Sequence, residues 1–127
     1  MKASELRIGN YVIVIKTSGT IEDFEAQIQC ADITRIFDKC FNIWNYRPIP
    51  LTEEWLVKFG FDKCTNNIDT WFINSIFLPF KLTYTANKNK LIPDYMGTNL
   101  RYAKVNYVHQ LQNLYFALTG EELQIKL

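Results

Sequence analysis

The side chain best suited to chemistry in this 127-residue chain is its single histidine, His109. An imidazole works as a general base only when a second group orients it beside a pocket. No acidic residue stands three or four positions from His109, the separations that would place it on the same helical face. The sequence therefore predicts that His109 is not catalytic, and it predicts no other catalytic residue.

Cysteine spacing argues against a metal site. Cys30, Cys40 and Cys64 are far apart, whereas structural zinc sites usually take closely spaced pairs of ligands. Each cysteine lies in or beside an apolar segment, which is typical of a buried, inert thiol, and the odd, unpaired set predicts reduced thiols. We expect neither a metal nor a cofactor, because the chain also lacks a glycine-rich phosphate loop and the GxSxG and HExxH motifs.

A basic stretch runs from residue 81 to residue 104, with tyrosines between the cations and Asp94 as its only carboxylate. Cations that follow a phosphate backbone, with rings that stack on bases, are typical of surfaces that bind single-stranded nucleic acid. The alternative is a sheet whose solvent face carries lysines, which discourage edge pairing. The net charge of +1 favours this alternative. The candidate nucleic-acid contacts are Lys81, Lys88, Lys90, Arg101, Lys104, Tyr84 and Tyr102.

A short helix is predicted near residues 52–59. Thr52 is placed to cap it by accepting a bond from an early amide, and Glu53 and Glu54 in the first turn suit the helix dipole. Gly60 is placed to end the helix, because glycine readily adopts the left-handed backbone conformation that follows many helices. Both ends of this helix are therefore specified locally.

A longer helix is predicted near residues 107–118, capped by Asn106 and ended by Gly120. At 100° per residue, one stripe of this helix is apolar and forms the predicted core face. The opposite face carries His109, Asn113 and Phe116, which we expect to point away from the core as an interaction patch. The alternative is a solvated surface with Phe116 tucked under another element. The predicted core stripe contains Tyr107, Val108, Leu111, Leu114, Tyr115 and Leu118.

Short strands account for much of the remaining sequence. Residues 24–30 alternate apolar and polar, which predicts a half-buried strand with Phe24, Ala26, Ile28 and Cys30 on its core face. Further strands are predicted at 11–15, 70–74, 80–85, 100–105 and 123–127, a hairpin from "DITRIF" (32–37) and "CFNIW" (40–44), a polar turn at 86–90 and a loop at 91–99.

These elements predict the α+β class: a curled antiparallel sheet with two helices, and an SH3-like barrel as one arrangement of the N-terminal half. Length and composition, with 48% apolar and 21% charged residues, predict a single domain over residues 1–127. Aromatic residues reach 15%, more than a small core usually encloses, and surplus rings tend to lie at interfaces. The sequence has no apolar run of membrane-spanning length and no signal-peptide pattern, so we expect a cytoplasmic protein without membrane contact.

Three blocks of the sequence, "LRIGNYV" (6–12), "PIPLTEEWLVKFGF" (48–61) and "YVHQLQNLYFALTGEEL" (107–123), resemble a group of small uncharacterised proteins. Prophages and other mobile elements of Bacteroides-like gut bacteria encode this group. The resemblance implies a bacterial or phage cytoplasmic setting. It also implies interaction with host or phage machinery rather than a metabolic role.

The leading functional prediction is a non-enzymatic binding protein whose partner is a host or phage protein or a second copy of the chain. One alternative is a nucleic-acid-binding accessory module that uses the basic stretch. A second alternative is a small-molecule or nucleotide binder, or an enzyme, with a pocket between the sheet and the long helix.

Overall fold

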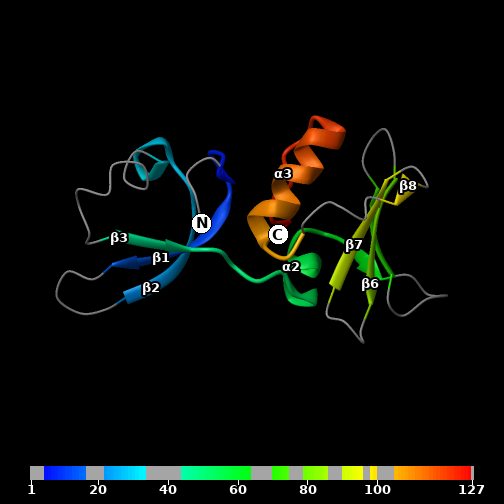
Figure 1. The fold of residues 1–127 in the computed structure, drawn as a ribbon, viewed down its shortest axis with the longest axis horizontal. Coiled ribbons are helices and arrows are strands. Elements are labelled where there is room, and N and C mark those ends of the chain that lie inside the picture. The colour runs from blue at the N-terminus through cyan, green and yellow to red at the C-terminus, as the bar shows by residue number, and fades with distance from the viewer. Residues whose placement is uncertain are drawn as a thin grey trace. The chain divides into compact units, whose positions relative to one another are not determined.

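The computed structural model describes residues 5–16, 22–33, 44–63, 70–74, 79–85, 90–95, 98–99 and 105–126 (Figure 1). The chain divides into two compact units. The N-terminal unit contains Met1–Pro50 and Tyr107–Asn113, and the C-terminal unit contains Leu51–Asn106 and Leu114–Leu127. Helices and antiparallel sheets are both present, which confirms the α+β class. The single domain over residues 1–127 stays a prediction.

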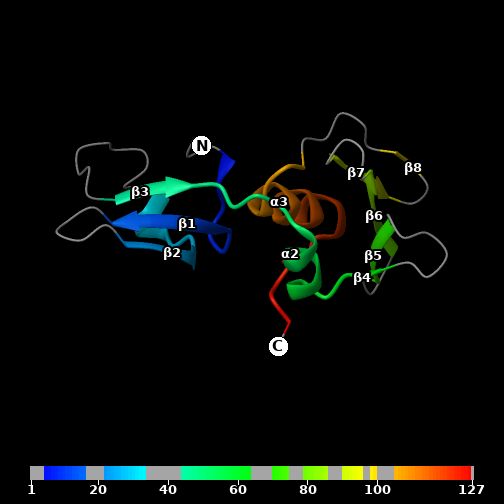
Figure 2. The ribbon, with the colours of Figure 1, turned by 90° about the horizontal axis from the view of Figure 1, so that it is seen from below.

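The sheet of the N-terminal unit has three antiparallel strands in the order β2-β1-β3 (Figure 2). The strands are β1 (Tyr11–Lys16), β2 (Glu22–Gln27) and β3 (Trp44–Arg47). The strand predicted at 11–15 is confirmed, and the strand predicted at 24–30 is β2, which begins and ends earlier in the chain. The sheet is open, because β2 and β3 each pair with β1 and not with each other. The SH3-like barrel prediction is therefore wrong.

The core of this unit lies around one face of the sheet. Opposed positions such as Val12 and Ala26, or Val14 and Tyr46, bring apolar side chains together. The buried cluster consists of Leu6, Val12, Val14 and Ile28, with Ala26, Ile33 and Tyr46 packed against it.

A helical turn at residues 30–33 replaces the start of the predicted "DITRIF" strand. The reason is local: Asp32 accepts a hydrogen bond from the backbone N–H of Gln29 (2.8 Å), a bond that favours a helix start over a strand. The other carboxylate oxygen of Asp32 accepts from the Tyr46 hydroxyl (2.7 Å), which attaches the turn to β3. The rest of that predicted hairpin, up to residue 43, lies outside the described residues.

The sheet of the C-terminal unit is an antiparallel meander in chain order, from β4 to β8. Its strands are β4 (Asp62–Lys63), β5 (Thr70–Asn74), β6 (Pro79–Thr85), β7 (Lys90–Tyr95) and β8 (Thr98–Asn99). The strands predicted at 70–74 and 80–85 are confirmed. The turn predicted at 86–90 falls mostly outside the described residues, and its last residue, Lys90, begins β7.

The loop predicted at 91–99 is wrong, because β7 and β8 occupy most of it. Pro93 is unusual within a strand, since proline cannot donate to a strand ladder. In the described sheet β8 pairs only with Asp94 and Tyr95, so β7 is an edge at Pro93 on that side. An edge position tolerates the missing donor.

The short helix α2 (Glu53–Lys58) lies within the predicted range 52–59. Thr52 is its N-cap residue, but it makes no side-chain capping bond, so the predicted bond is wrong. The predicted left-handed conformation of Gly60 at the end of the helix is confirmed by its φ of 84°. The N–H groups of Gly60 and Phe61 donate to carbonyls in the last turn, which ends the helix at the glycine.

The long helix α3 (Val108–Thr119) is shifted by one residue from the predicted range. Tyr107, not Asn106, precedes its first residue, and the Tyr107 N–H donates to Gln110 Oε1 (3.2 Å), the glutamine half of a capping box. Gly120 follows the helix with a φ of 74°, as predicted. Residues 122–126 form no strand, so the closing strand predicted at 123–127 is wrong over its described part. Of the strand predicted at 100–105, only Val105 is described, and it is not in a strand.

Candidate functional site

The first turns of α3 carry polar side chains toward residues 5–11, within the N-terminal unit. Gln112 is 1% exposed and makes two hydrogen bonds to this segment. Its Oε1 accepts from the backbone N–H of Tyr11 (2.8 Å), and its Nε2 donates to the carbonyl of Gly9 (3.1 Å). One amide side chain thus bonds two backbone groups, and the Gly9 carbonyl also accepts from Gln27 Nε2 (3.2 Å).

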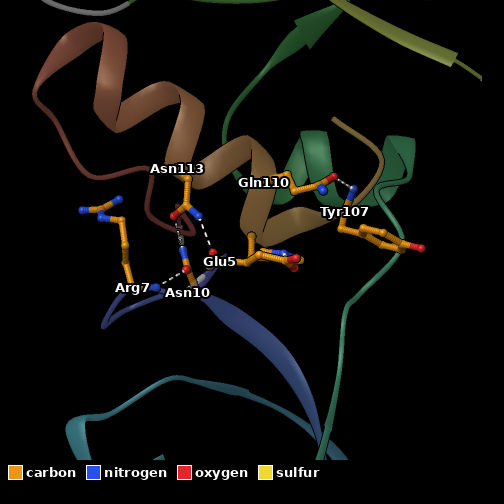
Figure 3. Close-up of polar contacts among 7 residues, drawn as sticks. Glu5, Arg7, Asn10, Tyr107, Gln110 and Asn113 are labelled. Atoms are coloured by element: carbon orange, nitrogen blue, oxygen red, sulfur yellow. Dashed lines mark hydrogen bonds and ion pairs between the residues drawn. The ribbon is translucent and has the colours of Figure 1, made fainter. Parts of the chain in front are cut away.

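A second set of bonds surrounds Asn10, which is also 1% exposed (Figure 3). Its Oδ1 accepts from the Arg7 N–H, and its Nδ2 donates to Asn113 Oδ1 (3.0 Å). Asn113 Nδ2 donates in turn to the carbonyl of Glu5 (2.7 Å). The blocks "LRIGNYV" and "YVHQLQN" therefore meet through a connected polar network.

His109 lies beside this network, and its side chain is 1% exposed. Its Nε2 stands 3.9 Å from Glu5 Oε2, which is too long for a hydrogen bond. Its ring stacks with Tyr107, with centroids 6.0 Å apart and planes at 11°. Neither ring nitrogen has a hydrogen-bond partner in the described part of the chain.

The pKa of His109 is lowered from its ordinary value of 6.5, chiefly because burial disfavours the charged imidazolium. The Glu5 carboxylate opposes this shift, and the amino terminus of the chain adds to it. His109 is also the second residue of α3, where the positive end of the helix dipole disfavours a cation. The ring is therefore neutral at pH 7.

The structure separates the three residues of the predicted interaction patch. His109 is buried, so the prediction that it points away from the core is wrong. Asn113 is half-buried and bonded to residues before β1, and Phe116 alone is exposed, at 38%. The predicted core stripe is only partly buried, since Leu114 and Leu118 are half-exposed. A contact role for the patch stays a prediction.

Gln112 and Asn10 were missed as structural residues because polar side chains were expected to face water. For Gln112, one feature of the sequence does indicate burial. No residue of "VHQLQNLYFALT" (108–119) is charged. A helix without any charged face is typically covered on more than one side.

An exposed aromatic side chain lies on β2, where the sequence predicted a core face. Phe24 is 45% exposed, and Cys30 is exposed as well, so both burial predictions are wrong. Phe24 is opposite Val14 in the register of β2 and β1. Among the described strands only β1 lies beside β2, so β2 is an edge strand. A hollow at this edge is lined by Ile13, Asp23, Phe24 and Glu25.

The basic stretch is only partly described. Lys88, Arg101, Lys104 and Tyr102 lie outside the described residues. Lys81 is opposite Asp94 in the register of β6 and β7. Positions 81 and 84 belong to opposite faces of β6, because faces alternate residue by residue. Nucleic-acid binding by these residues stays a prediction.

Metal-ligating residues do not gather in the described ranges, which contain no group of three or more His, Cys, Asp or Glu residues placed to hold an ion. Cys40 and Cys64 lie outside those ranges. Among the helices that the structure describes, none is both long and apolar enough to cross a membrane. In comparisons with known proteins, no family model, curated protein or solved structure matches the chain.

Proposed function

We propose that this chain is a non-enzymatic protein that acts by binding another protein. The observation that supports the proposal is Phe24, a ring 45% exposed on the outer strand β2. Full burial of a phenylalanine side chain contributes about 1.5–3 kcal/mol, so an exposed ring can stabilise a complex when a partner covers it. Aromatic side chains are also enriched at the centres of protein interfaces.

The surroundings of Phe24 support a protein partner over a small molecule. The hollow that it lines is also lined by Ile13, Asp23 and Glu25, so aromatic, aliphatic and acidic side chains occur together at this edge. Protein interfaces likewise combine aromatic residues with polar residues at their rim. The partner in this proposal is a host or phage protein, or a second copy of the chain. The cytoplasmic setting and the prophage or mobile-element origin belong to the same proposal.

A photo-crosslinking experiment tests the proposal. Benzoylphenylalanine placed at position 24 in cells that produce the protein should form an adduct with one protein. The same label at Val57, which is 60% exposed on α2, is the control for nonspecific capture. The purified partner should then bind wild type at least about tenfold more tightly than Phe24→Ala, since aromatic anchors carry much of the binding energy.

The outcomes separate the competing functions. Equal affinity for wild type and Phe24→Ala would remove Phe24 from the interface and leave the proposal without support. Retention of single-stranded DNA or RNA that weakens steeply with salt would replace the proposal with nucleic-acid binding. A change in light-scattering mass on Phe24→Ala would identify the partner as a second copy.

A further inference from the structure

His109 is a fully buried titratable group that the proposed binding function does not use. Its two ring nitrogens are buried without a hydrogen-bond partner among the described residues. A buried polar group without a partner is costly, and native proteins keep few of them. The side chain of Glu5, in contrast, is 46% exposed and stands 3.9 Å from the ring.

Few charged groups act on the His109 ring. Glu5 belongs to the segment before β1, and the amino terminus also acts on the ring. Helix α3 has no charged residue. The Arg7 side chain points away from Glu5 (Figure 3). In the described part of the chain, Glu5 is therefore the carboxylate placed to favour a protonated His109.

The position of His109 connects its charge to the attachment of α3. Gln112 and Asn113, three and four residues further along the helix, bond to Tyr11, Gly9 and the Glu5 carbonyl. Residues at these separations share a helical face. If the His109 imidazolium turns outward to reach water, this face of α3 has to move as well. The hydrogen bonds of Gln112 and Asn113 would then be disturbed.

We propose that His109 is a proton-sensitive latch of the N-terminal unit. While the ring is neutral, the first turns of α3 remain attached to residues 5–11. Protonation of the ring favours opening of this attachment, because the buried site disfavours the imidazolium, and Glu5 limits the opening by stabilising the imidazolium of the attached state. This inference does not depend on the proposed binding function.

Nuclear magnetic resonance titration of the ring tests the first step. His109 is the only histidine, so its ring resonances need no further assignment. Its midpoint should lie below 6.5, and Glu5→Gln should move the midpoint lower, because the carboxylate favours the charged ring. A midpoint at or above 6.5, or an unchanged midpoint in Glu5→Gln, would overturn the proposal.

Amide hydrogen exchange, corrected for intrinsic rates, tests the opening itself. The Tyr11 N–H, which donates to Gln112, reports on the attachment, and the Phe61 N–H after α2 is the control. The opening constant at Tyr11 should rise about tenfold per pH unit as the pH falls from 6.5 toward the midpoint of the folded protein. The constant at Phe61 should stay unchanged over this range.

Two further outcomes decide against the latch. Equal rises at Tyr11 and Phe61 would indicate unfolding of the whole chain rather than local opening. A Tyr11 constant that does not depend on pH would show that protonation opens nothing. In His109→Gln the pH dependence at Tyr11 should disappear. If that variant does not fold, the exchange of wild type at Tyr11 and Phe61, together with the titrations of wild type and Glu5→Gln, decides.

Discussion

The Oε1 atom of Gln112 accepts a hydrogen bond from the backbone N–H of Tyr11 at 2.8 Å, although 101 positions separate the two residues in the chain. Because Gln112 is 1% exposed, water cannot readily replace this bond. The start of β1 and the first half of α3 are therefore joined through a buried amide.

Gln112→Ala should lower the free energy of unfolding by about 1–3 kcal/mol, because it leaves the Tyr11 N–H and the Gly9 carbonyl without this side chain. Gln124→Ala, at an exposed position after α3, is the matched control and should change stability by no more than about 0.5 kcal/mol. Urea unfolding measures both. Similar values for the two variants would show that the buried amide contributes nothing to stability.

Leu111→Ala should destabilise the protein by about 2–5 kcal/mol, because Leu111 is fully buried and its removal leaves a cavity. Phe116→Ala, on the same helix but 38% exposed, should cost much less, within about 0.5 kcal/mol if it behaves as a surface site. Thermal and urea unfolding of the pair give the comparison. A large cost for Phe116→Ala would mean that its ring is part of the folded core and is not available to a partner.

Alkaline pH should destabilise the C-terminal unit through Tyr115. Burial raises the pKa of Tyr115 above its ordinary value of 10.0, and the charge of Glu121 and a hydrogen bond with it act in the same direction. The folded state then holds the phenol proton more tightly than the unfolded state. The stabilisation is complete below pH 10 and is lost as the pH rises through the folded pKa.

The measurement for Tyr115 is the free energy of unfolding between pH 9 and pH 11. The decrease over this range should be smaller in Tyr115→Phe, which has no phenol proton to lose. It should also be smaller in Glu121→Gln, which removes the carboxylate that raises the pKa. A decrease as large in Tyr115→Phe as in wild type would assign the alkaline loss to other groups.

Gly60→Ala should cost about 1–2 kcal/mol, because a φ of 84° is unfavourable for a residue with a Cβ atom. The added Cβ also meets the side chain of Lys126, but a flexible lysine can move aside. Gly60→Asn should cost less than Gly60→Ala, since asparagine tolerates the left-handed conformation. Circular dichroism melting would contradict the prediction if both variants were as stable as wild type.

Several elements could be located from local sequence signals alone. Alternating and β-branched residues located β1, β5 and β6, because strand faces alternate at every residue. Glycine located the ends of α2 and α3, since Gly60 and Gly120 adopt positive φ angles that other residues avoid. The α+β class follows from these local signals.

Which side of each element is covered could not be predicted from local patterns, because it depends on how distant segments pack. The helical pattern placed His109 opposite the apolar stripe, but residues 5–11, about a hundred positions away, supply backbone groups that cover the polar side of α3 as well. The strand pattern placed Phe24 on a core face. However, β2 has only β1 as a neighbour among the described strands, and the Phe24 side chain stays exposed. Periodicity fixes which side chains share a face, whereas burial depends on segments that are distant in sequence.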